Sequence, residues 1–169
     1  AIHPETGQLW TVEHGAKGGD ELNHPEAGKN YGWPEVTYGH EYSGDTIGAG
    51  LTEKPGIEQP VHFWDPSIAP SGMVFYTGDR YPQWKGNLFV GCMSGTLPCQ
   101  GLVRLVLDGD KVVAEERLLL DRKQRIRMRR TLIASGVYLL AGLGQWWSAD
   151  IGLADRDMAR WLILCLAPG

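Results

Sequence analysis

Short apolar runs bounded by glycine and proline recur along the chain. Three of them share a form: "TGQLWTVEHG" at 6–15, "KGNLFVGCMSG" at 85–95 and "ASGVYLLAGL" at 134–143. In each, a glycine turn leads into an apolar residue, an aromatic residue and an aliphatic or β-branched run, a pattern that predicts a strand entered from a tight turn. The segment "SGMVFYTG" at 71–78 predicts a further strand. We therefore interpret the chain as mostly β.

An aromatic residue occupies the same place in the three similar segments: Trp10, Phe89 and Tyr138. These residues lie 79 and 49 positions apart. The separations suit a repeat of roughly 40 to 50 residues with one degenerate member, which is the period of the four-stranded blades of a β-propeller.

The clearest local element is a hairpin. Two β-rich runs flank Asp108-Gly109, a dipeptide typical of two-residue hairpin turns. We expect strands near Leu102–Leu107 and Lys111–Leu119.

The segment between Gly28 and Pro60 is dense in glycine, proline, tyrosine and tryptophan and has no sustained period. This composition predicts a long ordered loop. Binding groups are commonly placed on such loops when a rigid β scaffold supports them.

Composition narrows the class of protein. The chain has 169 residues, is 43% hydrophobic and 21% charged, and carries a formal charge of -4. The charge argues against a general nucleic-acid or anionic-membrane surface. The longest apolar run, "WLILCLA" at 161–167, is far below the roughly 20 residues that span a bilayer. We therefore expect a soluble protein of about one domain, with no nucleic-acid partner and no membrane span.

The chain opens on "AIHPETGQLW", without an initiator methionine or a signal peptide, which we interpret as the middle of a gene product. The missing signal then says nothing about export. Cys92 and Cys99 flank the turn-rich spacer "MSGTLP" and could pair in an oxidising compartment, with Cys165 left single. Two unpaired, small apolar side chains explain the same residues.

The stretch "EHGAKGGDELN" at 13–23 concentrates polar chemistry. It holds a histidine, three glycines, the adjacent carboxylates Asp20 and Glu21, and an asparagine, with little that is apolar. Glycines let backbone carbonyls turn inward, and carboxylates beside such carbonyls suit a hard cation such as calcium. A polar surface turn explains the same residues equally well, because no full calcium-loop signature is present.

Five motifs occur in order along residues 1–127: "LWTVEHGAKGGDELN", "GKNYGWPEVTYGHEYSG", "WDPSIAPSGMVFYTG", "GNLFVG" and "DRKQRIR". Together they resemble the C-terminal half of the soluble aldose sugar dehydrogenases of the glucose/sorbosone dehydrogenase family. The resemblance implies an all-β, partial six-bladed β-propeller of about three blades. It also implies a periplasmic or secreted enzyme that oxidises aldoses to lactones with pyrroloquinoline quinone (PQQ) and calcium, passing electrons to an acceptor such as a quinone or a cytochrome.

The resemblance also assigns site residues. Glu21 matches a calcium-binding carboxylate, and Tyr31 matches a residue that offers its main-chain carbonyl; both are the oxygen donors that calcium requires. The expected PQQ contacts are Tyr42, the tripeptide Cys92, Met93 and Ser94, and the run Arg125, Ile126 and Arg127.

The two arginines suit a tricarboxylic cofactor, because guanidinium groups bind carboxylates in a bidentate manner and keep their charge. Strand alternation would place Arg125 and Arg127 on one face, with Ile126 opposite. Without the resemblance, a solvated basic run is the simpler interpretation of "DRKQRIRMRR".

Two departures from the family pattern stand out. Ser94 occupies a position where the family commonly has lysine, which implies a weaker or altered cofactor site. After Arg127 the family's closing turn and strand are missing, so we expect residues 1–127 to be the propeller portion and residues 128–169 to be a divergent tail from a frameshift or gene end.

No catalytic residue is assigned in this chain. In the family a histidine takes the proton of the sugar's anomeric hydroxyl, and that histidine lies in the N-terminal half, so we expect this chain alone to be inactive. His14 matches a pocket-lining position instead, while the remaining four are expected at turns or the surface: His3, His24, His40 and His62. Two alternatives remain: a non-catalytic propeller segment that binds a partner or saccharide, and a calcium-dependent lactone hydrolase.

Overall fold

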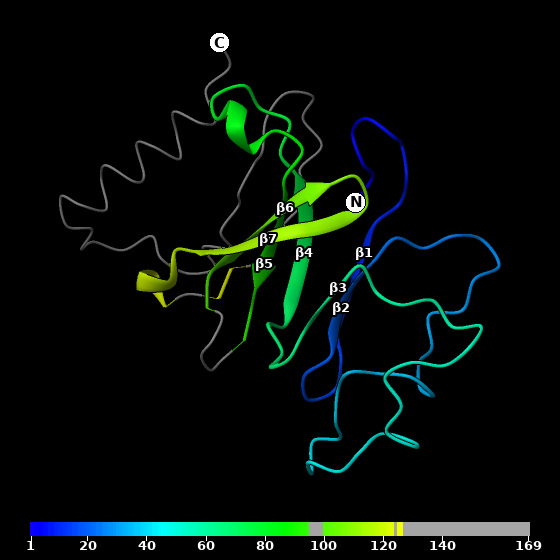
Figure 1. Cartoon of the computed structure of the whole chain (residues 1–169). Coiled ribbons are helices and arrows are strands. Elements are labelled where there is room, and N and C mark those ends of the chain that lie inside the picture. Colours follow the sequence, from blue (N-terminus) through cyan, green and yellow to red (C-terminus); the bar gives the residue numbers. More distant parts are fainter. Residues whose placement is uncertain (95–99, 124, 127–169) are drawn as a thin grey trace.

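The computed structural model describes residues 1–94, 100–123 and 125–126, which form two antiparallel sheets (Figure 1). The first sheet has the order β1-β2-β3, with β1 at Thr11–Glu13, β2 at Asp20–Asn23 and β3 at His62–Trp64. The second has the order β4-β5-β6-β7, with β4 at Pro70–Phe75, β5 at Leu88–Cys92, β6 at Leu102–Asp108 and β7 at Lys111–Leu118. In both sheets, strands that follow one another in sequence are neighbours.

The described residues contain no α-helix, only the short 3-10 helices η1 at Pro82–Trp84 and η2 at Leu120–Arg122. The expectation of an all-β chain is therefore confirmed for the described ranges. Neither helix has the length or the apolar character needed to cross a membrane.

The predicted hairpin is present with a small shift in its turn. Asp108 pairs with Lys111, so the turn consists of Gly109 and Asp110, one residue later than the Asp108-Gly109 turn that the sequence predicted. Gly109 has a φ of +59°, a left-handed conformation that glycine adopts at little cost.

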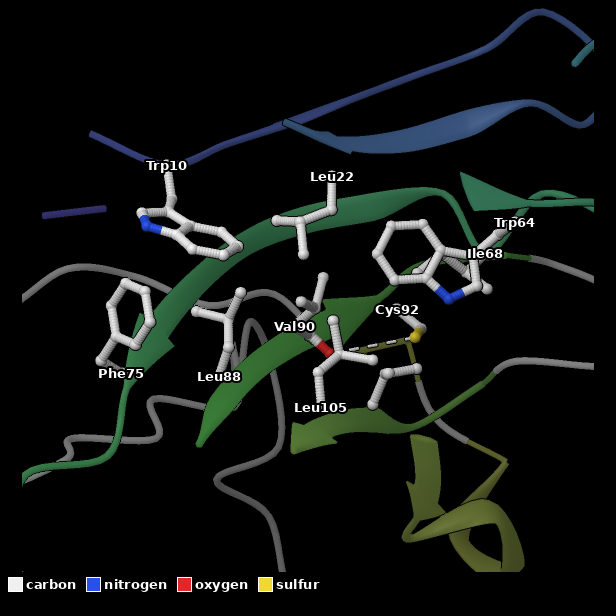
Figure 2. Close-up of a cluster of buried hydrophobic side chains, with 10 residues drawn as sticks. Trp10, Leu22, Trp64, Ile68, Phe75, Leu88, Val90, Cys92 and Leu105 are labelled. Atoms are coloured by element: carbon white, nitrogen blue, oxygen red, sulfur yellow. Dashed lines mark hydrogen bonds between the residues drawn. The ribbon is translucent and has the colours of Figure 1, made fainter. Parts of the chain in front are cut away.

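The main apolar core lies between the two sheets, where side chains of the first sheet meet those of the second (Figure 2). Alternation in β5 sends Leu88, Val90 and Cys92 toward this core. Burying each large apolar side chain contributes about 1.5–3 kcal/mol, so this contact holds the sheets together. Its buried members are Trp10, Leu22, Trp64, Ile68, Phe75, Leu88, Val90, Cys92, Val103 and Leu105.

A second apolar cluster covers the opposite face of the second sheet. Phe89, which alternates with Leu88 and Val90, packs there against Tyr76 and Trp84. Trp10 thus lies on the face of the first sheet that meets the second, and Phe89 lies on the face of the second sheet that points away from the first. The two aromatic side chains thus point in the same direction relative to their own sheets, which is consistent with the repeat inferred from the two segments. The third aromatic residue, Tyr138, lies outside the described residues.

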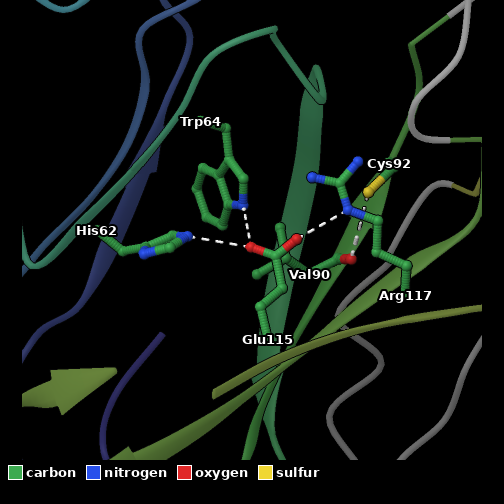
Figure 3. A network of polar contacts seen from close by, with 6 residues as sticks. All are labelled: His62, Trp64, Val90, Cys92, Glu115 and Arg117. Atoms are coloured by element: carbon green, nitrogen blue, oxygen red, sulfur yellow. Dashed lines mark hydrogen bonds and ion pairs between the residues drawn. The ribbon is translucent and has the colours of Figure 1, made fainter. Parts of the chain in front are cut away.

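A polar network joins the two sheets beside the core (Figure 3). Glu115 on β7 accepts hydrogen bonds from Trp64 Nε1 at 2.9 Å and from His62 Nε2 at 3.0 Å, both on β3. Arg117 Nε donates to its other oxygen at 2.8 Å. Burial alone would raise the pKa of Glu115, but the hydrogen bonds from these three side chains and the charge of Arg117 lower it to about 2.

His62 is therefore a half-buried partner in a network between the sheets, and the expectation of a turn or surface role for it was wrong. That expectation failed because Glu115 lies 53 positions away in the sequence.

The long loop predicted between Gly28 and Pro60 is confirmed, since no strand or helix interrupts the chain between β2 and β3. Isolated bridges order it: Val36 pairs with Leu51, and His40 pairs with both Lys17 and Thr46. The loop is thereby tied to the 13–19 segment at the edge of the first sheet.

Candidate functional site

A cavity of about 640 Å³ opens where segments from both sheets meet. Its walls are residues 14–18, the 40–44 turn of the long loop, residues 65–69 between β3 and β4, and Met93 and Ser94 after β5, together with Arg125. Of the expected PQQ contacts, Tyr42, Met93, Ser94 and Arg125 are thus brought together on one cavity.

Asp20, the first residue of β2, is fully buried and holds two of these walls together. Its Oδ1 accepts a hydrogen bond from the backbone N–H of Gly15 at 2.9 Å. Its Oδ2 accepts one from the Ser67 hydroxyl at 2.6 Å and one from the Ala69 N–H at 2.8 Å. Because three donors compensate the burial of this carboxylate, it fixes the spacing between the two segments.

The 67–69 segment is hydrogen-bonded in turn to the residues that follow β5. The backbone N–H of Ser94 donates to the Ile68 carbonyl at 3.2 Å, and that of Met93 donates to the Ala69 carbonyl at 3.0 Å. Main-chain bonds therefore fix the positions of Met93 and Ser94 relative to the 67–69 segment.

Arg125 reaches the cavity because its neighbour is anchored to the second sheet. The Ile126 N–H donates to the Cys92 carbonyl at 2.9 Å, and the Ser71 hydroxyl donates to the Ile126 carbonyl at 2.8 Å. Ile126 and Cys92 have buried side chains in the two apolar clusters, and their main-chain groups bond within the protein, so the structure does not bring these two expected contacts onto the cavity. Cys92 is disulfide-bonded; Cys99 lies outside the described residues.

Close packing explains two of the glycines beneath the cavity. Gly18 has a φ of +79°, and a Cβ there would collide with the Asp65 carboxylate. Gly19 has a φ of +69°, and a Cβ there would collide with the backbone nitrogen of Gly39. At Gly19 the close backbone requires glycine, and at Gly18 the positive φ favours it.

Several polar side chains on the cavity are exposed and available to a ligand. Tyr42 is 80% exposed, and His14 lines the cavity as its alignment predicted. His40 also lines it from the long loop, opposite Lys17.

A second cavity of about 230 Å³ adjoins the first, and His14 and Gly15 line both. The expected calcium ligands Glu21 and Tyr31 lie on this second cavity, together with Glu13. The structure thus separates the two sets of expected site residues, because the calcium set lines one cavity and the cofactor set lines the other.

Glu13 and Glu21 face each other across paired strands, and one amide links them. Asn23 Nδ2 donates to Glu13 Oε1 at 3.1 Å and to Glu21 Oε2 at 3.2 Å. Burial raises the pKa of Glu21, the hydrogen bond from Asn23 opposes this, and the charge of Glu13 adds to the rise. Within the described residues neither carboxylate forms a salt bridge, so a cation would relieve both charges.

The Tyr31 hydroxyl is occupied locally, since it donates to the His24 carbonyl at 2.9 Å and accepts from the Glu26 N–H at 3.0 Å. The hydroxyl is therefore already engaged, and the main-chain carbonyl of Tyr31 stays the predicted calcium ligand. Across the part of the chain that the structure describes, no three His, Cys, Asp or Glu side chains form a metal cluster. A calcium ion here would need carbonyl or water oxygens in addition to carboxylates.

Arg127, the second arginine of the expected pair, lies outside the described residues, as do residues 128–169. The sequence interpretation missed Asp20, which it considered only as a neighbour of Glu21. Alternation was the available signal: Asp20 and the core residue Leu22 share one face of β2, so Asp20 should point inward.

Comparisons with known proteins agree on one family. The sequence model described as Glucose / Sorbosone dehydrogenase matches residues 1–144. Aldose sugar dehydrogenase YliI of Escherichia coli (strain K12) is 45% identical over 141 residues, which cover 83% of this chain and 37% of that protein.

Solved structures give the same result. The chain is similar to a crystal structure of a glucose dehydrogenase, with a TM-score of 0.69 and 52% identity over 75% of this chain and 36% of that one. It is also similar to the apo form of the soluble aldose sugar dehydrogenase (Asd) of Escherichia coli, with a TM-score of 0.68, 45% identity and the same coverage. The chain therefore spans little more than a third of the length of these relatives.

Proposed function

Because this chain belongs to the glucose/sorbosone dehydrogenase family, we propose that it is part of an aldose sugar dehydrogenase that oxidises aldoses to lactones with PQQ and calcium. The observation that carries the proposal is the cavity that gathers Tyr42, Met93, Ser94 and Arg125 from segments far apart in the sequence. The position of Arg125 on the same cavity as the other expected contacts supports a binding role over a solvated basic run.

In this proposal the two sheets are consecutive blades of a six-bladed propeller, and the full chain supplies about three blades. Each sheet is an antiparallel meander, and the sheets pack face to face through the main core. The common direction of Trp10 and Phe89 supports a repeated unit. An incomplete ring leaves strand edges and an apolar blade face without a partner, which favours self-association of the isolated chain.

The residues on the first cavity suit PQQ. The volume of about 640 Å³ lies within the range of small-molecule sites. Arg125 offers a guanidinium to a carboxylate, and the exposed ring of Tyr42 offers a flat surface to a planar ligand. Arg127 belongs to the same proposed contact set. When bound, the quinone supplies the acceptor for the two electrons taken from the sugar.

The second cavity suits calcium. Glu21 supplies a charged oxygen and Tyr31 a carbonyl oxygen, and the unpaired charge of the two neighbouring glutamates favours a cation. Calcium held by these two residues would connect β2 to the long loop.

We further propose that this chain alone does not turn over sugar, because the histidine base is expected in a part of the protein that it does not contain. The decisive measurement is dye reduction by a longer protein that includes this chain, with aldose, PQQ and calcium supplied. Bound quinone should add its absorbance to the folded protein, which neither a lactone hydrolase nor a non-catalytic binding segment would show. No turnover and no quinone absorbance in the folded protein would exclude the proposed function.

A further inference from the structure

Lys17 lies on the first cavity and has a well-defined backbone position. Its N–H donates to the His40 carbonyl at 2.9 Å, and its carbonyl accepts from the His40 N–H at 3.0 Å. Its Nζ lies over the 40–44 turn, 3.9 Å from the point that a Cβ on Gly44 would occupy. The two hydrogen bonds to His40 therefore fix the backbone of Lys17 at the edge of the first cavity.

Among the described residues, no carboxylate pairs with the Lys17 ammonium group. Three other lysines each meet a carboxylate: Lys29 at 2.8 Å, Lys54 at 2.8 Å and Lys85 at 2.9 Å. Within the described ranges, Lys17 and Arg125 form no ion pair, although both line the cavity.

The cavity lining is therefore cationic on balance. Asp65 is the one acidic residue among the described lining residues, and it faces Gly18, while Lys17 and Arg125 are both positive. Ser94, on the wall beside Arg125, supplies a hydroxyl group and no charge. Two cations from separate segments, neither in an ion pair among the described residues, are an arrangement that favours an anion with more than one carboxylate.

We propose that Lys17 is a cofactor-binding residue whose ammonium group contacts a carboxylate of a planar polycarboxylate held between the 14–18 segment and Arg125. This inference rests on the proposed function for the identity of the ligand. It assigns to Lys17 a positive charge that Ser94 does not provide, on a segment of the cavity wall separate from that of Arg125. Since lysine acts as a flexible point charge, the contact depends on the charge more than on a fixed geometry.

The test compares Lys17→Ala and Lys17→Glu with Lys54→Ala in the full chain. Lys54 is a matched control because it is also exposed and pairs with Glu35 away from the cavity. Each protein is titrated with PQQ plus calcium, followed by tryptophan fluorescence, and separately with benzene-1,3,5-tricarboxylate, followed by calorimetry. We expect equal thermal midpoints for the variants, because the Lys17 side chain has no ion-pair partner among the described residues. Equal midpoints would show that the substitutions do not affect folding.

We expect Lys17→Ala to raise the Kd of PQQ by about three- to tenfold, the range for a charged contact at an exposed site. Lys17→Glu should raise it further, and Lys54→Ala should match wild type. The dependence of affinity on salt should also weaken in Lys17→Ala, because one charge is removed.

The outcomes separate the two proposals. If wild type binds PQQ and Lys17→Ala binds it as tightly as Lys54→Ala does, the role of Lys17 is refuted while the proposed function stands. If wild type binds the tricarboxylate in a Lys17-dependent manner but does not bind PQQ, the anion site stands and the proposed cofactor is wrong. Binding of neither probe by wild type overturns both.

Discussion

Replacing Glu115 with glutamine should weaken the contact between the two sheets and lower the free energy of unfolding. Wild-type Glu115 accepts three hydrogen bonds, from Trp64, His62 and Arg117, at 2.8 to 3.0 Å. Two of these donors stand on β3 of the first sheet, so the carboxylate links the sheets next to their core (Figure 3). Glutamine keeps the shape of the side chain but removes its charge and turns one acceptor into a donor.

The magnitude follows from the pKa of Glu115. Its folded pKa is lowered from 4.5 to about 2, and at about 1.4 kcal/mol per pH unit the shift corresponds to about 3 kcal/mol. The side chain is 21% exposed, so solvent screening reduces this figure, and we expect Glu115→Gln to lower the free energy of unfolding by about 1–2 kcal/mol at pH 7.

The pH dependence has a definite sign. Because the folded pKa lies below the unfolded value of 4.5, the stabilisation by Glu115 is fully present above that pH and is lost as the pH falls toward about 2. The difference in stability between wild type and Glu115→Gln should therefore shrink as the pH falls from about 4.5 toward about 2.

Urea unfolding followed by tryptophan fluorescence measures this difference at each pH. Glu116→Gln is the matched control, since Glu116 is the next residue on β7 and pairs with Arg104 at 2.8 Å but is 49% exposed. We expect that control to change stability by less than about 0.5 kcal/mol. Equal stabilities for the two variants at pH 7, or a difference that persists unchanged at pH 3, would refute the reasoning.

Three further substitutions test the cavities. Asp20→Asn should lower the free energy of unfolding, measured by urea titration, by about 2–3 kcal/mol, because the new amide N–H faces one of the three buried donors. The exposed control Asp45→Asn should leave the free energy of unfolding unchanged, and equal effects of the two substitutions would refute the structural role of Asp20. Glu21→Gln should weaken calcium binding in calorimetry, with Glu35→Gln as the control, and an unchanged titration would favour a turn residue. Arg125→Ala should raise the Kd of PQQ by about tenfold and Arg125→Lys by less, and three matching curves would take this arginine out of the site.

The strands and the long loop could be predicted because their signals are local. Alternation, glycine turns and the apolar run around Phe89 depend on neighbouring residues, and so the strand that became β5 was predicted close to its observed bounds. The cavity residues Tyr42 and Arg125 were found only through the family resemblance, since nothing in the local pattern relates positions so far apart.

The network around Glu115 and the bonds of Asp20 could not be predicted in the same way. Asp20 meets Ser67 across 47 positions, and Glu115 meets Trp64 across 51. Such pairs form only when the sheets pack together. The alternation of β7 shows Glu115 as one more polar residue on a half-exposed strand, and only the packing against β3 gives it partners.

The adjacent carboxylates Asp20 and Glu21 illustrate how one strand divides the chemistry of the site. As consecutive residues of β2 they point to opposite faces, and so they do not bind one ion together. Asp20 turns inward and ties the walls of the first cavity, while Glu21 lines the second cavity with Glu13. A polar surface turn does not describe this arrangement, because Asp20 is fully buried in β2, while calcium binding by Glu21 stays a prediction. Substitution of Asp20 should therefore lower the free energy of unfolding and weaken ligand binding in the first cavity. Substitution of Glu21 should instead weaken cation binding in the second cavity.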